Sequence, residues 1–388
     1  MGSSLAGNKI IVGYFPGLKP FHLSKCTGQI PFSIAKRHNL DCAIVTDGSA
    51  DKKEEFYEYS QFFTPGIKIV NLKSRRFFKK DLSFTFFLIT NALKIRLLYQ
   101  YQFGFDFNYR IGFYSILFKF INPDGKLFIR FEADYNNLQA LNASNFSGFK
   151  RWLIRKYLKS VDYWGTIDSA DFPGLKKIPI LLKHLNCNSF YHQPNGFSPL
   201  AINNYINKVN PYNIRENSIV LSGRLDQTIK GLDVFLKAIN GQDLKNWKIW
   251  LMGGEREQVE EIVSFYIDKS KNYNIEIFGF VSYQELYNRI NMSKIYILSS
   301  YSDGMPLAAV EAMALGNVII SADHYGMKIA LENGRIGKIF PRGDFMGLRK
   351  ELLYLINNED STRNLHEQTV KKTWDEFTWD SIVKNVIL

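Results

Sequence analysis

The sequence has few residues of the kinds that build metal centres or disulfide frameworks. Its 388 residues include three cysteines, Cys26, Cys42 and Cys187, whose spacing is neither that of a zinc site nor that of paired disulfides. The six histidines show no metal-ligand spacing either. We therefore expect a protein of a reducing compartment without a metal site of Cys or His.

Long apolar segments and two common catalytic signatures are also missing. The longest apolar stretch, 82–93, is too short and too interrupted to span a bilayer, and the polar first eight residues do not resemble a signal peptide. No G-x-G-x-x-G is present, which disfavours a dinucleotide-dependent oxidoreductase. No Ser-His-Asp or Cys-His arrangement can be recognised. A cytoplasmic location is the expectation.

Positive charge is present in excess, and the excess lies in the first half. Residues 1–197 hold 27 Lys and Arg against 14 Asp and Glu, whereas residues 198–388 hold 22 against 23. Such an asymmetry is typical of a surface that meets an anionic partner. Because no stacking motif of the known RNA-binding modules occurs, we expect no nucleic-acid partner.

Two basic stretches of the first half indicate what that anionic partner is. Residues 74–80 interleave four cations with two aromatic residues, and residues 149–159 combine five cations with Trp152 and Tyr157. Both stretches favour peripheral contact with an anionic membrane surface on the inner face of the membrane. The alternatives are a solvated loop for the first stretch and, for the second, a helix with one face packed on a sheet and its cations in water.

The first half has a Rossmann-like opening of strand, loop, helix and strand. Residues 9–15 and 41–46 are predicted strands, and 29–38 a predicted helix between them. Three residues of the first loop are candidate acceptor or sugar contacts: Gly17, Lys25 and Gly28. Further strands are predicted at 67–72, 103–109, 126–131 and 161–167.

An acid-x-acid pair, Glu132 and Asp134, follows one of these predicted strands. Such a pair can bind a divalent ion on a diphosphate. We discount a metal here, because cations elsewhere in the chain can supply the same charge. Glu132 and Asp134 are instead candidate polar contacts to a donor or acceptor sugar.

The second half carries a strand, a glycine-containing turn and a helix, in the segment SSYSDGMPLAAVEAMALG at 299–316 after the apolar run 295–298. Unpaired backbone N–H groups at a helix N-terminus favour a bound phosphate. Asp303 lies in the turn and Glu311 about two helical turns further on, so both carboxylates can border one ligand. By itself the pattern is also compatible with a helix cap and a solvated face.

Three other strand ends of the second half carry matching chemistry. In 219–231 a predicted strand is followed by Arg224 and Lys230, which together can neutralise a diphosphate. The segments WKIWLMGG at 247–254 and IEIFGFV at 275–281 are further predicted strands that end at or near glycine.

At this point the segments GRLDQTIKG at 223–231, IFGFV at 277–281 and 299–316 resemble the nucleotide-binding half of the family-4 retaining glycosyltransferases. The resemblance implies an α/β protein of the GT-B fold, with two facing Rossmann-like domains and an interdomain cleft. It covers about 219–340 strongly and the first half only in outline. One departure is that the first acid of the family's Glu pair is Asp303 here.

The resemblance also implies roles for individual residues. The family's diphosphate cations match Arg224 and Lys230, which with Asp303 form the candidate catalytic group, and the acid that holds the ribose hydroxyls matches Glu311. The implied donor-binding residues are Gly223, Gly253, Phe280, Val281, Gly304, Met305, Pro306, Leu307 and Glu311. No metal and no cofactor are implied, since the nucleotide-sugar is a substrate.

The sequence thus predicts an acceptor domain at 1–197, a donor domain at 198–372 and a C-terminal segment at 373–388 that crosses back to the first domain, with a linker at 197–217. The expected function is retaining transfer of a sugar from a nucleotide-diphosphate-sugar to a glycan or lipid-linked acceptor in cell-surface polysaccharide or glycolipid synthesis. The alternatives are a same-fold transferase with a soluble acceptor and a non-catalytic nucleotide-sugar-binding subunit.

Overall fold

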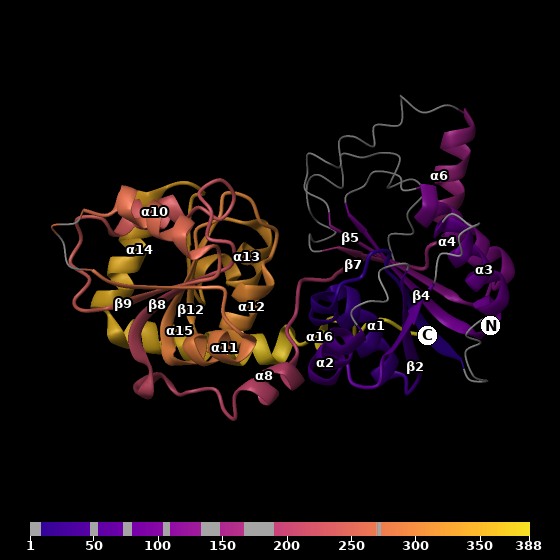
Figure 1. Cartoon of the computed structure of the whole chain (residues 1–388), viewed down its shortest axis with the longest axis horizontal. Coiled ribbons are helices and arrows are strands. Elements are labelled where there is room, and N and C mark those ends of the chain that lie inside the picture. Colours follow the sequence, from indigo (N-terminus) through magenta and orange to yellow (C-terminus); the bar gives the residue numbers. More distant parts are fainter. Residues whose placement is uncertain are drawn as a thin grey trace. The chain divides into compact units, whose positions relative to one another are not determined.

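The computed structural model describes residues 9–46, 53–72, 80–103, 109–132, 148–166, 190–268, 270 and 273–388, and divides the chain into two compact units (Figure 1). The first unit comprises residues 1–194 and 379–388, the second residues 195–378. Three features of the sequence analysis lie outside the described residues: the candidate sugar contact Asp134, the cysteine Cys187, and residues 74–79 of the first basic stretch.

The first unit is built on a parallel seven-stranded sheet of order β3-β2-β1-β4-β5-β6-β7. Helices α3, α4 and α6 cover one face, where their side chains share one core with β1 and β4, while α1 packs on the other. The elements are β1 (Ile10–Tyr14), α1 (Cys26–Arg37), β2 (Asp41–Thr46), α2 (Lys53–Phe63), β3 (Lys68–Asn71), α3 (Lys80–Asn91), β4 (Ile95–Phe103), α4 (Tyr109–Ile121), β5 (Lys126–Glu132), α6 (Gly148–Ser160), β6 (Tyr163–Thr166), β7 (Phe190–His192) and α16 (Trp379–Ile382).

The second unit has a parallel six-stranded sheet of order β10-β9-β8-β11-β12-β13. Its elements are α8 (Pro199–Tyr205), β8 (Glu216–Ser222), α9 (Leu232–Ile239), β9 (Lys248–Met252), α10 (Arg256–Tyr266), β10 (Asn274–Gly279), α11 (Tyr283–Met292), β11 (Ser293–Leu298), α12 (Leu307–Ala314), β12 (Val318–Ala322), α13 (Tyr325–Ala330), β13 (Lys338–Phe340), α14 (Phe345–Asn357) and α15 (Glu359–Glu376).

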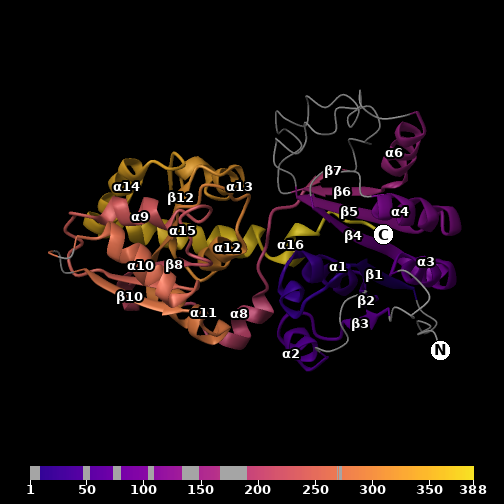
Figure 2. The same cartoon turned by 45° about the horizontal axis from the view of Figure 1, so that its top comes forward.

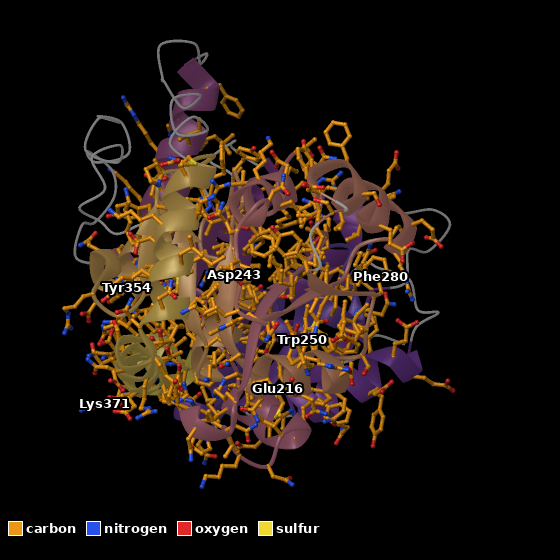
Figure 3. The ribbon with its side chains drawn as sticks, turned by 90° about the vertical axis from the view of Figure 1, so that its left-hand side faces the viewer. Glu216, Asp243, Trp250, Phe280, Tyr354 and Lys371 are labelled. Carbon is orange, nitrogen blue, oxygen red and sulfur yellow. The ribbon has the colours of Figure 1, made fainter. Side chains whose placement is uncertain are left out.

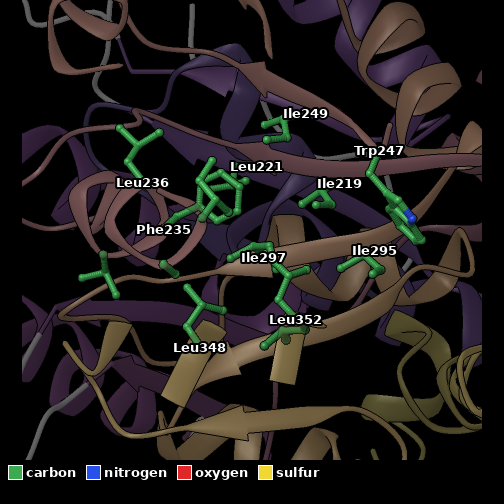
Figure 4. Packing of buried hydrophobic residues seen from close by; sticks show 14 of the residues in the cluster. Ile219, Leu221, Phe235, Leu236, Trp247, Ile249, Ile295, Ile297, Leu348 and Leu352 are labelled. Carbon is green, nitrogen blue, oxygen red and sulfur yellow. The ribbon is translucent and has the colours of Figure 1, made fainter. Parts of the chain in front are cut away.

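The core of the second unit follows from the continuous apolar runs of its central strands. All six residues of β11 are buried, as expected for a parallel strand that is covered on both faces. Every second residue of the central strands, such as Ile219 in β8 and Ile295 in β11, faces Phe235 of α9 and Leu352 of α14 (Figure 4). This packing holds the carboxyl ends of the central strands, and the loops that follow them, at one edge of the sheet.

The expected α/β class is confirmed, and most predicted strands lie within one to three residues of the observed ones. Of the strand predicted at 103–109, residues 104–108 lie outside the described residues, while Phe103 ends β4 (Ile95–Phe103), a strand that the sequence analysis did not predict, and Tyr109 starts α4. The polar Gln100 interrupts the apolar pattern by which a buried strand is recognised in a sequence. In the structure Gln100 is nevertheless buried in β4, where it accepts a hydrogen bond from Ser115 Oγ at 2.9 Å.

The linker predicted at 197–217 is also partly wrong, since it contains α8 and the 3₁₀ turn Tyr212–Ile214. Ser198 caps α8 by accepting a hydrogen bond from Ala201 N, and Pro199 occupies the first turn.

The boundaries of the units differ from the predicted ones by a few residues at each crossing. Residues 195–197 and 373–378 belong to the second unit. Asn195 Nδ2 donates to Met305 O at 2.6 Å, and Trp374 Nε1 donates to Ala314 O at 2.9 Å. These two hydrogen bonds attach both crossing segments to α12 and the loop before it.

In the part of the chain that the structure describes, no helix has the length and apolar character needed to cross a membrane.

Candidate functional site

The strand order of the second sheet reverses between β8 and β11, the two central strands. In open parallel α/β sheets, ligands bind outside the carboxyl ends of the strands at the point where the order reverses. The loops at this point are 223–231 after β8 and 299–306 after β11. They contain Arg224, Lys230 and Asp303, the three candidate catalytic residues.

The loop after β8 is shaped by the carboxylate of Asp226. Its Oδ1 accepts hydrogen bonds from Ile229 N at 2.6 Å and from Lys230 N at 2.9 Å. Burial alone would raise the pKa of Asp226, but the two N–H groups, with the nearby Arg224 guanidinium, lower it below its usual value. The ionised Asp226 therefore fixes the backbone that presents Lys230.

Lys230 and Asp303 meet across the reversal point. Lys230 Nζ lies 2.6 Å from Asp303 Oδ2, and both side chains are largely covered, with 26% and 16% exposed. Their loops are also joined by Tyr301 N, which donates to Ile229 O at 2.8 Å. The structure thus brings together a cation and a carboxylate that are 73 positions apart in the sequence.

Gly231 allows this close approach of the two loops. It has φ +62 and forms the N-terminal boundary of α9, and a Cβ atom at this position would overlap the carbonyl oxygen of Ser299. Only glycine adopts this backbone conformation at no cost and leaves room for the Ser299 carbonyl.

Arg224 lies in the same loop as Lys230 but has a different partner. Its side chain is 65% exposed, and its Nε is 3.7 Å from Asp226 Oδ2. An ion pair this long and this exposed holds the guanidinium only weakly.

Glu311 lies on α12 and is held by a tyrosine of a neighbouring helix. Tyr287 OH, on α11, donates to Glu311 Oε1 at 2.9 Å. Tyr287 is buried, and burial together with the Glu311 carboxylate raises its pKa, so the phenol stays protonated as a donor. Sequence reasoning missed Tyr287, because nothing in the sequence pairs residues of adjacent helices.

The turn before α12 contains the predicted donor contacts. Pro306 is the N-terminal cap of α12, and the first turn of this helix has no acidic residue. Met305 is buried, and its carbonyl oxygen accepts a hydrogen bond from Asn195 Nδ2. Gly304 packs against Gly326 of α13, since a Cβ atom added to Gly326 would lie 2.8 Å from Gly304 O. The N-terminus of α12, from Leu307 on, is thus held at the same sheet edge as Asp303.

Glycines at the ends of neighbouring strands bring further backbone to this edge. Gly253 N, after β9, donates to Gly279 O at the end of β10 at 2.5 Å, and a Cβ on Gly253 would overlap Gly223 O. The next residue after β10, Phe280, is 72% exposed and lies at the periphery of the unit in Figure 3. Val281, the other predicted base contact, is half-buried.

His324, which the sequence did not single out, lies beside the loop that carries Asp303. It follows β12, is buried, and its Nε2 is 2.9 Å from Ser300 O and 3.0 Å from Ser300 Oγ. Because the Ser300 carbonyl can only accept, Nε2 carries the proton. Burial lowers the pKa of His324 despite the opposing effect of Asp303, so the imidazole is neutral at pH 7.

The candidate residues of the first unit are distributed differently. Gly17 is exposed with φ +67 in the loop after β1. Lys25 occupies the N-cap position of α1, where its side chain makes no capping hydrogen bond, and its Nζ lies 4.7 Å from the centroid of the Phe21 ring. Gly28 lies inside α1, where a Cβ would lie 2.6 Å from the backbone of Leu23, so close helix packing accounts for this glycine. Glu132 ends β5.

Comparison with known proteins agrees with this architecture. Residues 205–372 match the family model described as glycosyl transferases group 1. Over 187 residues the chain is 27% identical to an uncharacterized glycosyltransferase of Methanocaldococcus jannaschii, which covers 48% of this chain and 52% of that protein. It is 21% identical over 174 residues to the phosphatidyl-myo-inositol mannosyltransferase of Mycobacterium leprae, covering 44% and 45% of the two chains. The matched regions thus span about half the length of these relatives.

Solved structures are similar over nearly the whole chain. A glycosyltransferase from Rickettsia africae superimposes with a TM-score of 0.66 at 14% identity, covering 97% of this chain and 96% of that one. Anabaena HepE, solved with UDP, superimposes with a TM-score of 0.67 at 14% identity and covers 97% of each chain.

The fold is therefore that of the GT-B glycosyltransferases, with two Rossmann-like halves. Residues 205–372 thus match the group 1 glycosyltransferases, and over these residues the resemblance to the family-4 enzymes is confirmed.

Proposed function

We propose that this protein is a retaining, metal-independent glycosyltransferase that uses a nucleoside-diphosphate sugar. The observation that carries the proposal is the Lys230–Asp303 pair at the reversal point between β8 and β11. A diphosphate bound there would take Lys230 as a partner, together with Arg224 from the same loop and the N-terminal dipole of α12. Asp303 is then released towards the donor sugar.

The chemistry needs charge stabilisation more than a protein nucleophile. The bond between the sugar's anomeric carbon and the diphosphate breaks, and the bond to the acceptor oxygen forms on the same face. The acceptor proton passes to the departing diphosphate. Once bound to the diphosphate, Lys230 and Arg224 would stabilise its developing charge without a metal ion.

Glu311 supplies the second anchor of the donor. A carboxylate accepts hydrogen bonds from the two ribose hydroxyls, and Tyr287 restricts the Glu311 carboxylate to one orientation. Because HepE was solved with UDP and, in a further structure, with UDP-glucose, uridine donors are the first to be tested.

The proposed acceptor is a glycan or lipid-linked molecule of cell-surface polysaccharide or glycolipid synthesis. Curated relatives include the mannosyltransferase named above and a capsular polysaccharide biosynthesis glycosyltransferase of Staphylococcus aureus, 24% identical over 134 residues. We place the enzyme on the inner face of the membrane, held peripherally through the basic first half of the chain.

The test is donor turnover with a panel of uridine, guanosine and adenosine diphosphate sugars in the presence of a chelator. Lys230→Ala or Arg224→Ala is expected to lower kcat by about 100-fold or more. The matched control is Lys248→Ala: Lys248 Nζ also lies 2.6 Å from a carboxylate, Glu216 Oε2, but at the amino ends of β9 and β8 (Figure 3 labels Glu216).

Turnover that survives Lys230→Ala, or falls equally in Lys248→Ala, contradicts the assigned role of the pair. Turnover that requires an added divalent ion contradicts metal independence. Nucleotide binding without turnover of any donor would instead support the non-catalytic nucleotide-sugar-binding subunit.

A further inference from the structure

Three neighbouring helices of the first unit, α3, α4 and α6, lie side by side on one face of the sheet (Figure 2). Their inner side chains form the core of the unit. Those buried in it include Phe84, Phe87 and Leu88 of α3, Ile111, Tyr114 and Phe118 of α4, and Ile154, Tyr157 and Leu158 of α6. These inner side chains are enough to pack the three helices on the sheet.

The outer faces of the same helices are also apolar, which the fold does not require. On α3, Leu82, Phe86 and Ile89 recur at helical spacing and are all exposed. Phe120 of α4 is 83% exposed and Trp152 of α6 is 54% exposed. A surface helix normally presents polar residues to water, so an apolar outer face on three adjacent helices marks an interaction surface.

A helix elsewhere in the same unit shows the ordinary pattern. The helix α2 carries three acidic residues, Glu54, Glu55 and Glu58. Of its large apolar or aromatic side chains, one, Tyr57, is exposed. The apolar outer face is therefore a property of α3, α4 and α6, not of the unit as a whole.

Cations accompany the apolar residues on α6. This helix has five Lys and Arg and no acidic residue. Arg155, Lys156 and Lys159 are exposed, and within the described residues none of them has an ion-pair partner. Lys156 Nζ lies 6.0 Å from the centroid of the Trp152 ring, so charge and aromatic surface occur together.

We propose that the outer faces of α3, α4 and α6 dock on an anionic lipid bilayer, with the aromatic and aliphatic side chains inserted at the level of the headgroups and the α6 cations bound to lipid phosphates. The proposal deepens the proposed function, on which it rests for the lipid-linked acceptor. An apolar surface with adjoining long cationic side chains matches the boundary between acyl chains and headgroups.

The charge distribution favours lipid over a second copy of the chain. Neither α4 nor α6 has an acidic residue, and α3 has one, Asp81, which follows Lys80 in the chain. A symmetric contact through these three helices would therefore bring the five α6 cations onto a surface that has one acidic residue to balance them. A bilayer that contains anionic lipids supplies the opposite charge.

The first test is sedimentation of the full chain with vesicles of phosphatidylcholine with and without phosphatidylglycerol. The triple variant F86S/F120S/W152S should bind anionic vesicles at least about tenfold more weakly than the wild type. The matched controls remove aromatic side chains of similar exposure from other surfaces: Tyr57→Ser on α2, and Phe265→Ser on α10 of the second unit, where Phe265 is 78% exposed. Both controls should bind like the wild type.

The second test separates insertion from electrostatic attraction. The variant R155Q/K156Q/K159Q should lose binding at low salt, and its difference from the wild type should shrink at high salt, because salt screens exposed charges. The aromatic triple variant should remain defective at both salt concentrations. Circular dichroism melting checks that each variant is folded, and the single variant Phe120→Ser replaces the triple one if that does not fold.

Three results would overturn the proposal. One is a wild type that does not bind anionic vesicles, and another is a triple variant that binds as well as the controls. The third is a wild-type dimer that the triple variant converts to a monomer, since the surface would then belong to a second copy. Donor turnover is measured in parallel without lipid: its absence in a chain that binds vesicles contradicts the proposed function and leaves the docking surface standing.

Discussion

Replacement of Gly231 by alanine tests whether the contact between the two central loops positions the candidate site. Gly231 combines two properties: a left-handed backbone at φ +62 and an approach to Ser299 O that excludes a Cβ atom. Gly241, just beyond the other end of α9, has a left-handed φ of +78, and no atom lies within 4 Å of the position that its Cβ would take. The pair Gly231→Ala and Gly241→Ala therefore separates backbone strain from collision.

The magnitudes follow from these two contributions. Left-handed alanine costs about 1–2 kcal/mol in either variant. At Gly231 the collision adds about 1–3 kcal/mol, the usual range for overpacking, because a backbone carbonyl cannot rotate away. For a unit of this size 1 kcal/mol lowers Tm by about 2–4 °C. We expect Gly241→Ala to lower Tm by about 2–8 °C, and Gly231→Ala to lower it further.

The assay is calorimetric melting of both variants, combined with nucleoside-diphosphate titration. In Gly231→Ala the 299–303 loop has to move, so Asp303 and Lys230 separate and the nucleotide affinity should fall. In Gly241→Ala the affinity should stay at the wild-type value. Equal Tm losses in the two variants, with unchanged affinity in both, would refute the idea that this contact builds the site.

Two further predictions concern buried polar groups. Tyr287→Phe removes the hydrogen bond to Glu311 and should weaken nucleotide binding about tenfold. The control Tyr273→Phe removes a hydrogen bond to a backbone carbonyl elsewhere in the unit and should leave nucleotide binding unchanged. Nucleotide titration of both variants measures the difference. The pKa values of His324 and His366 are lowered, chiefly by burial, so the unfolded chain binds more protons than the folded one below about pH 6.5. The stability of the second unit should therefore be complete above pH 6.5 and decrease as the pH falls below it, and a Tm that is constant from pH 7 to pH 5 would contradict this.

The sequence predicts those elements whose pattern is local. The strands of the second half are continuous apolar runs because a parallel strand is covered on both faces, and β11 has this pattern from end to end. β4 was missed because its buried Gln100 is paired with Ser115, a residue of the next helix, and such pairing leaves no trace in the local pattern. α8 was missed because its cap, Ser198, lies in a segment rich in Asn and Pro.

The candidate site likewise contains residues that local sequence motifs reveal and residues that only the structure reveals. Arg224, Lys230, Asp303 and Glu311 follow strand ends or lie in the helix that comes next, and the motif around each is continuous in sequence. Tyr287 reaches Glu311 from another helix. His324 contacts the Asp303 loop from the segment between β12 and α13. No spacing in the sequence announces such a contact, since it depends on which elements are neighbours in space.

The amino-acid sequence alone determined the α/β class and the chemistry at the strand ends of the second half, because both depend on residues that are close along the chain. Only the tertiary structure decided which of those strand ends are neighbours. The order β10-β9-β8-β11-β12-β13 sets β8 beside β11, and this adjacency joins Lys230 to Asp303. The apolar outer face of α3, α4 and α6 was likewise visible only in three dimensions, since a sequence shows that Phe86 and Phe120 are apolar but not which face of the helix is already buried.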